Sequence, residues 1–151
     1  MDKVVLAYIA GFFDGEGCVG LNRSNTRERF AYRLEVQITQ VDKAPLEFIK
    51  QFFGGSLSVS KRSLINPKRQ DCWHLVWADK SAESFLRALL PYLIVKREKT
   101  LLVLRYRDLP HLNNIENIKQ MNNKSKEEAM KLNQSIINKR RVIYDEWKTL
   151  V

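Results

Sequence analysis

The first apolar segment of the chain predicts a helix with no wide polar face. Asp2 stands directly before Lys3 and is a residue type that caps helix N-termini. The next positions are apolar on every side of the helical spiral, which is typical of a helix buried all round: Val4, Val5, Leu6, Tyr8, Ile9, Phe12 and Phe13. Small residues recur at spacings of three and four and form one stripe where another backbone can approach: Ala7, Ala10, Gly11, Asp14 and Gly15. Gly15 and Gly17 then end the helix near Glu16.

From Cys18 onward the apolar spacing changes to every second residue, which predicts strands. A first hairpin is predicted over residues 18–39, with a polar turn at 23–29. A second hairpin is predicted over residues 57–77, with a polar loop at 61–69. Each hairpin would carry one apolar face and one polar face.

Helical spacing returns in the other segments. Residues 44–53 fit a helix that has a proline in its first turn and two glycines after its end. Residues 82–93 and 96–107 fit two more helices, and residues 126–147 fit a last one. The stretch 113–123 is rich in Asn and poor in apolar residues, so we expect a loop or a short helix there.

This order of elements predicts an α+β fold in which helices cover the apolar face of one antiparallel sheet. The 151 residues fit a single domain, 1–151. Cys18 and Cys72 are too few for a disulfide framework or a zinc ribbon, which predicts a reducing, intracellular compartment. The longest apolar run is far too short to cross a bilayer, and the N-terminus lacks the basic region of a secretory signal, so we predict no contact with a membrane.

The basic charge of the chain is concentrated in one region. There are 26 Lys and Arg residues against 17 Asp and Glu, a net charge of +9, and residues 23–69 alone hold ten basic and four acidic side chains. Such clustering is typical of a nucleic-acid contact. Side chains that bond base edges and phosphates would project from the polar face of the sheet and its turns: Asn22, Ser24, Arg33, Glu35, Gln37, Ser58, Ser60, Arg62, Gln70 and His74. An ordinary solvated face is the alternative.

Two further charged features have a functional and a structural interpretation. Asp14 and Glu16 end an apolar helix, where the negative helix terminus disfavours acids unless a cation binds beside them. If the small-residue stripe packs on a second copy, two Glu16 carboxylates meet as in two-metal nucleases; a capped, solvated turn is the alternative. The run Lys139, Arg140 and Arg141 would contact phosphates outside the sheet, or form a solvated helix face.

Residues 9–17, with the sequence IAGFFDGEG, resemble the nine-residue LAGLIDADG signature of a homing endonuclease family, in its single-motif, homodimeric class. Ala10, Gly11, Asp14 and Gly17 are identical to the signature, and Glu16 replaces its final Asp. Residues 89–98 also resemble a later conserved stretch of that family, so the likeness covers about residues 4–110 and leaves 111–151 as a C-terminal helical extension. The resemblance implies an α-β-β-α-β-β-α core whose four-stranded antiparallel sheet binds DNA.

The resemblance also implies roles for individual residues. The first helix would form the dimer interface through Ala7, Ala10, Gly11 and Asp14. Glu16 would bind Mg²⁺, for which Mn²⁺ can substitute, with the Gly15 carbonyl as a further ligand. Gln40 matches a polar residue beside the attacking water, and Lys96 a basic residue that supports the developing phosphate charge. Gln40 as a strand cap and Lys96 as a surface lysine are the alternatives, and Lys43 is the weaker match to a second basic residue.

The function so implied is that of a homodimeric, Mg²⁺-dependent endonuclease of intron homing, which cleaves a long pseudo-palindromic site in double-stranded DNA without a small-molecule cofactor. A maturase-like RNA-binding splicing cofactor and a non-catalytic DNA-binding protein are the alternatives. His74 and His111 have no metal-ligand spacing, which disfavours a histidine-metal nuclease. The many Asn, Lys and Ile residues suggest an AT-rich genome, such as that of a chloroplast or mitochondrion, with a prokaryotic cytoplasm as the other possibility.

Overall fold

The chain forms one four-stranded antiparallel sheet with helices on one side. A computed structural model describes residues 1–23, 32–110 and 120–150. The strand order in the sheet is β1-β2-β4-β3, so each hairpin pairs internally and β2 pairs with β4 at the centre. The elements are α1 (Lys3–Glu16), β1 (Gly17–Arg23), β2 (Tyr32–Gln40), α2 (Ala44–Phe53), β3 (Ser56–Ser60), the short 3₁₀ turn η1 (Arg62–Leu64), β4 (Cys72–Ala78), α3 (Lys80–Leu89), the turn η2 (Leu90–Tyr92), α4 (Arg97–Arg107) and α6 (Asn123–Thr149). The predicted α+β class and the order of the core elements are confirmed.

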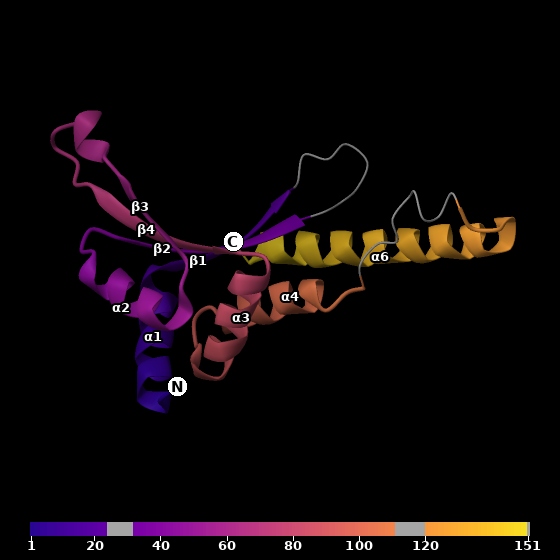
Figure 1. Ribbon diagram of the computed structural model, residues 1–151, viewed down its shortest axis with the longest axis horizontal. Helices are drawn as coiled ribbons and strands as arrows, with labels where there is room; N and C mark the ends of the chain where they lie inside the picture. The colour runs from indigo at the N-terminus through magenta and orange to yellow at the C-terminus, as the bar shows by residue number, and fades with distance from the viewer. Residues whose placement is uncertain (24–31, 111–119, 151) are drawn as a thin grey trace.

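Helices α1, α2, α3 and α4 lie on one side of the sheet and leave the other side open (Figure 1). The sheet is curved, and both of its ends rise on the open side (Figure 1). Alternation decides which side chains face the helices. In β2, Leu34, Val36 and Ile38 are fully buried, whereas the residues between them are exposed or half-buried. The sheet therefore offers one continuous polar surface.

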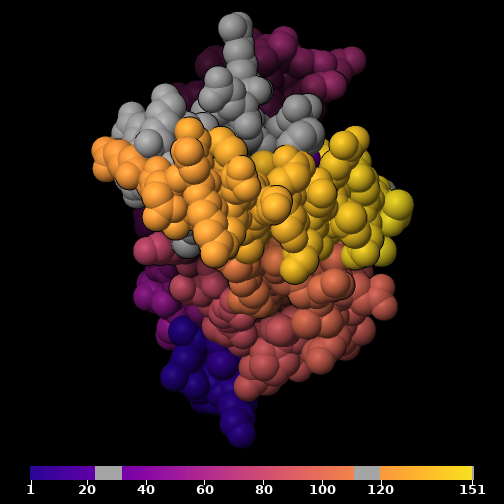
Figure 2. Space-filling model, turned by 90° about the vertical axis from the view of Figure 1, so that its right-hand side faces the viewer, coloured from indigo at the N-terminus to yellow at the C-terminus, as the bar shows by residue number. Residues whose placement is uncertain are grey.

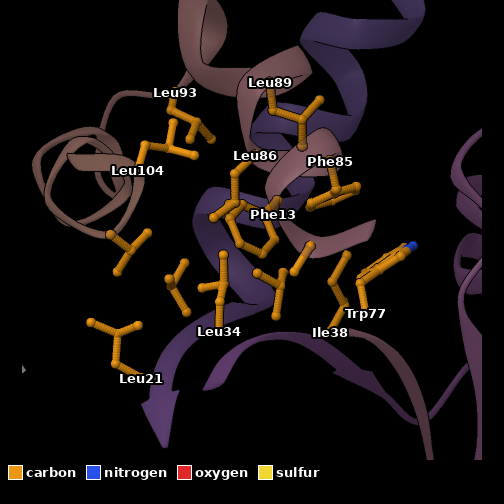
Figure 3. Packing of buried hydrophobic residues seen from close by; sticks show 14 of the residues in the cluster. Phe13, Leu21, Leu34, Ile38, Trp77, Phe85, Leu86, Leu89, Leu93 and Leu104 are labelled. Atoms are coloured by element: carbon orange, nitrogen blue, oxygen red, sulfur yellow. The ribbon is translucent and has the colours of Figure 1, made fainter. Parts of the chain in front are cut away.

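The core is built around aromatic rings from three elements. Phe13 of α1 meets Phe85 of α3 edge to face, with ring centroids 5.3 Å apart, and Phe85 stacks on Trp77 of β4 at 4.2 Å. The Trp77 indole also donates to the carbonyl of Phe53 at 3.0 Å, which ties the end of α2 to the sheet. Figure 3 shows Phe13 between α3 and the sheet residues Leu34 and Ile38. This packing fixes the C-terminal end of α1 against the start of β1.

The C-terminal helix α6 packs on α4 and joins the sheet through tyrosines. Figure 2 shows α6 running across the surface beside α4. Tyr144 stacks on Tyr32 of β2 with ring centroids 4.0 Å apart, and the Tyr106 hydroxyl accepts a hydrogen bond from the Tyr32 amide at 2.9 Å. The predicted extension is thus part of the same folded body as the sheet.

The bounds of two predicted helices are corrected. The last helix is longer than 126–147, because Asn122 caps it by accepting a hydrogen bond from the Ser125 amide. The helix predicted at 82–93 begins earlier, at Lys80, and is α-helical only to Leu89, since Pro91 lies in the 3₁₀ turn that follows. The turn at 24–29 and most of the stretch 113–123 lie outside the described residues.

Helix α1 is not buried on every side, in contrast to the prediction. Ile9, Ala10 and Phe13 face the core, but Val4 is 74% exposed and Tyr8 is 52% exposed. The reason is geometric: the sheet and α3 cover one side of the helix, and its N-terminal part projects beyond α2 (Figure 1). None of the described helices is long and apolar enough to cross a membrane.

Candidate DNA interface and catalytic corner

The open face of the sheet gathers most of the predicted DNA-contacting residues. The strand register places Asn22 opposite Arg33, and Ser58 opposite His74. The residues of this set that share the open face by strand alternation are Asn22, Arg33, Glu35, Gln37, Ser58, Ser60 and His74. Ser24 lies outside the described residues. Arg62 and Gln70 are exposed but lie off the strands, in the loop that joins β3 to β4.

Three of the open-face side chains form a hydrogen-bonded cluster. The Gln37 amide nitrogen lies 2.7 Å from Thr39 Oγ1 and 2.9 Å from His74 Nδ1. Thr39 Oγ1 is also 2.9 Å from His74 Nδ1. Sequence reasoning missed Thr39, although the alternation that selected Gln37 selects it too.

Arg33 belongs to a chain of ion pairs at the edge of this face. Its guanidinium lies 3.6 Å from the Asp79 carboxylate, which is also 3.8 Å from Arg107. Arg107 and Arg87 both donate to Glu83, at 3.1 and 3.0 Å. Partial burial raises the pKa of Glu83, but these two arginines outweigh that effect and hold it below its ordinary value. The network links a sheet residue to α3 and α4.

The loop between β3 and β4 is an ordered basic turn. Asp71 accepts hydrogen bonds from the Ser63 hydroxyl at 2.6 Å and from the Ser63 amide at 2.9 Å. These bonds, with the nearby Lys61 charge, hold the pKa of Asp71 below its ordinary value. Leu64 and Ile65 project into solvent at its tip. The cations of this loop, Lys61, Arg62, Lys68 and Arg69, are exposed beyond the strands.

The end of α1 is tied to the segment before α4 by Asp14. Its carboxylate accepts hydrogen bonds from the backbone amides of Ile94, Val95 and Lys96, at 2.7, 3.2 and 2.9 Å. The Lys96 ammonium in turn donates to the backbone carbonyl of Asp14. The Asp14 carboxylate thus holds two segments of one chain together, and its place in an interface between copies stays a prediction.

The three predicted catalytic residues stand at the ends of three elements: Glu16 ends α1, Gln40 ends β2, and Lys96 directly precedes α4. Glu16 ends α1 and is exposed, and it forms no hydrogen bond or ion pair within the described residues. The next residue, Gly17, pairs with Ile38, so the helix end lies beside the last residues of β2, which include Gln40. Gln40 Oε1 accepts from the Val41 amide at 2.8 Å, which is the strand-capping contact expected of the alternative role. Lys96 is half-buried, with its ammonium 5.9 Å from the centre of the Phe13 ring.

The donor set at this corner fits a divalent cation only in part. Glu16 offers a carboxylate, and the adjacent helix end offers carbonyl oxygens such as that of Gly15, both of which are hard oxygen ligands. Within residues 1–23, 32–110 and 120–150, however, no three His, Cys, Asp or Glu side chains come together.

The small residues of α1 have different surroundings. A methyl group on Gly11 or Gly15 would meet no atom of the chain within 4 Å. Ala7 is also exposed. Ala10, in contrast, is completely buried in the chain's own core, which corrects the prediction that it lies in an interface. The exposed part of the small-residue stripe is thus narrower than the sequence suggested, because it lacks Ala10. Packing within one chain does not explain why Gly11 and Gly15 are glycine.

The remaining basic residues predicted from the sequence have different surroundings in the structure. Arg140 lies over the Tyr106 ring, 5.4 Å from its centre, and donates to the Pro110 carbonyl at 3.2 Å, so it packs within the chain, and its contact with a phosphate stays a prediction. Lys139 is exposed and lines an open groove of about 890 Å³ between α4 and α6, and Arg141 is exposed. Lys43 is bound to Glu47 at 2.6 Å and lies over the Trp73 ring.

Comparisons with known proteins agree with this geometry. Residues 9–71, less than half of the chain, match the family described as LAGLIDADG endonuclease. No curated protein matches the chain. The fold is similar to the homing endonuclease I-CvuI in complex with the I-CreI target in the presence of Mg, with a TM-score of 0.69 and 20% identity over 99% of this chain and 83% of that one.

Two further solved structures are similar. The archaeal intron-encoded homing endonuclease I-Vdi141I complexed with DNA has a TM-score of 0.58 and 18% identity, over 99% of both chains. The LAGLIDADG homing endonuclease I-GzeII in complex with a DNA target has a TM-score of 0.57 and 18% identity, over 89% of this chain but 43% of that one. The family match over residues 9–71 and the fold shared over almost the whole length both make this chain similar to LAGLIDADG homing endonucleases.

Proposed function

We propose that this protein is a homodimeric, metal-dependent endonuclease that binds double-stranded DNA and cleaves it at a specific, pseudo-palindromic site, as an enzyme of intron homing. The observation that carries the proposal is the position of Glu16 at the edge of an open polar sheet face. That face presents amide, hydroxyl, imidazole and guanidinium groups at strand spacing, which suits readout of base edges in a major groove. The solved structures of similar fold are described as complexes with DNA.

The proposed dimer uses the exposed side of α1. Within one chain, a Cβ atom at Gly11 or Gly15 would meet no atom within 4 Å, so packing inside the chain does not require glycine there. We attribute these glycines to the close approach of a second chain. Val4 and Ala7 extend the same exposed side. A second α1 packed there would bring the two Glu16 residues together at one end of the helix pair. The structure of I-GzeII, of which this chain covers 43%, is consistent with two such units acting together.

Each residue of the corner has a distinct proposed task. Glu16 and the Gly15 carbonyl hold a divalent cation, Mg²⁺ or Mn²⁺, with the second Glu16 completing the ligand set. When bound, the cation supplies Lewis-acid polarisation of a water and of a phosphate oxygen. Lys96, fixed by its bond to the Asp14 carbonyl, places a positive charge near the phosphate. Gln40 accepts from the Val41 amide through Oε1 and keeps its amide protons for a water or a phosphate oxygen.

Cleavage of a randomised duplex library tests this proposal. We expect purified protein with Mg²⁺ to release recurrent double-strand ends, and the Glu16→Gln protein to bind the same duplexes without cutting them. Glu128→Gln is the matched control, because Glu128 is an exposed acid on α6 far along the chain from the corner. Binding without cuts by the wild-type protein in either Mg²⁺ or Mn²⁺ would instead indicate a DNA-binding protein, and retention of RNA alone would indicate a maturase.

A further inference from the structure

The cluster of Gln37, Thr39 and His74 lies at the centre of the open face. Gln37 and Thr39 point to the same side of β2, and the register places His74 of β4 directly opposite Thr39. All three side chains are half-buried. Their three mutual contacts, at 2.7, 2.9 and 2.9 Å, leave little freedom to any one of them. The cluster is therefore held in one arrangement before any ligand binds.

Hydrogen-bond chemistry fixes which atoms of the cluster face outward. The Gln37 amide nitrogen can only donate, so His74 Nδ1 accepts and the ring proton lies on Nε2. The Thr39 hydroxyl lies between them, accepting from Gln37 and close enough to Nδ1 to donate to it. Gln37 Oε1 and His74 Nε2 form no hydrogen bond among the described residues, and neither is a buried unpartnered atom. The cluster thus presents one acceptor and one donor.

We propose that Gln37, Thr39 and His74 act as a single reading unit that selects adenine at one base pair in each half-site. In the major groove, adenine offers the N6 amino donor beside the N7 acceptor, which matches Gln37 Oε1 and the His74 Nε2 proton. Guanine offers two acceptors, and one of them would face Oε1 without a proton between them. Gln37 and His74 contact the base, whereas Thr39 is a positioning residue. This inference rests on the proposed function.

The test is selection of bound duplexes from a randomised library, followed by sequencing. For the wild-type protein at about pH 7.5 we expect one strongly preferred adenine in each half-site, favoured over guanine by roughly tenfold. The Thr39→Val protein, which loses only the hydroxyl, keeps the site but loses most of the preference at that pair.

Two further variants test whether the cluster controls the base preference at one pair or whether a substitution weakens DNA binding in general. His74→Asn shortens the side chain and removes the Nε2 donor, so we expect the preference for adenine at that pair to fall. Thr149→Val removes a hydroxyl at the end of α6 and leaves the base preference at every position unchanged. If wild-type protein selects a site but neither Thr39→Val nor His74→Asn alters the preference at any single pair, the reading unit is wrong and the proposed function stands. If wild-type protein selects no duplex, the proposed function itself fails.

Discussion

At the scale of single residues, neighbouring glycines of the signature serve different purposes. Gly17 is required by packing within the chain, because a methyl group there would lie 2.1 Å from the Phe13 ring and 2.6 Å from the Phe13 carbonyl. Gly11 and Gly15 have no such neighbour. The sequence has glycine at all three positions, and it cannot distinguish these reasons, since the difference depends on which side of α1 faces the core.

The first prediction concerns Gly17. Substitution Gly17→Ala forces Phe13 and the helix end apart, and we expect a loss of about 1–3 kcal/mol in the free energy of unfolding. Thermal melting followed by circular dichroism should show a fall of roughly 5–10 °C. Gly20→Ala is the matched control, because its methyl group would meet the Glu35 carbonyl at an ordinary 3.6 Å. Equal melting temperatures for the two variants would contradict this account of Gly17.

At the scale of elements, the spacing of apolar residues predicted which helices and strands form, but not how segments far apart in sequence contact one another. The shift from helical to alternating spacing identified α1, both hairpins and α2, because each has one apolar face against the shared core. Alternation also selected the open face. It could not show that Asp14 binds the amides before α4 or that Arg140 lies over Tyr106, because both contacts join segments far apart in sequence.

The ion pairs between α3 and α4 give a prediction about pH. Glu83 binds Arg87 and Arg107, and its pKa in the folded chain is lowered from an ordinary 4.5. Its carboxylate therefore stabilises the fold above that ordinary value, and the contribution is lost as pH falls through the lowered pKa. We expect Glu83→Gln to be about 1 kcal/mol less stable than wild type at pH 7, with the difference vanishing on acidification.

Urea unfolding at several pH values measures this difference. Glu127→Gln is the control, because Glu127 is an exposed acid of α6 with no ion pair among the described residues. A difference between Glu83→Gln and wild type that persisted at a pH of about 2 would show that the side chain acts through packing and not through its charge.

At the scale of the whole molecule, one chain leaves two features incomplete. Val4 and Gly11 of α1 are exposed, and no group of three His, Cys, Asp or Glu side chains forms around Glu16 within the described residues. Both features lie on the same helix, so the proposed packing of two α1 helices would affect both. The sequence could suggest a function through its resemblance to a family, whereas the arrangement of the proposed site depends on a second chain.

The dimer itself can be tested through Gly11. Substitution Gly11→Leu leaves the fold of one chain intact, because the new side chain enters open space, but it prevents close approach of a second helix. Sedimentation should give twice the 17.7 kDa of one chain for wild type and 17.7 kDa for the variant. Lys124→Leu, an exposed substitution on α6, should remain a dimer. An unchanged mass for Gly11→Leu would exclude α1 as the interface.

The most direct test of the central claim is to map the released ends on both strands of the DNA that the protein cleaves. Two identical active sites related by a two-fold axis must cut the two strands at symmetric positions about the centre of a pseudo-palindromic site. We predict such paired ends with Mg²⁺, and none with Glu16→Gln. Cuts placed without symmetry, or cuts that survive Glu16→Gln, would contradict a homodimeric endonuclease whose two Glu16 residues meet at its centre.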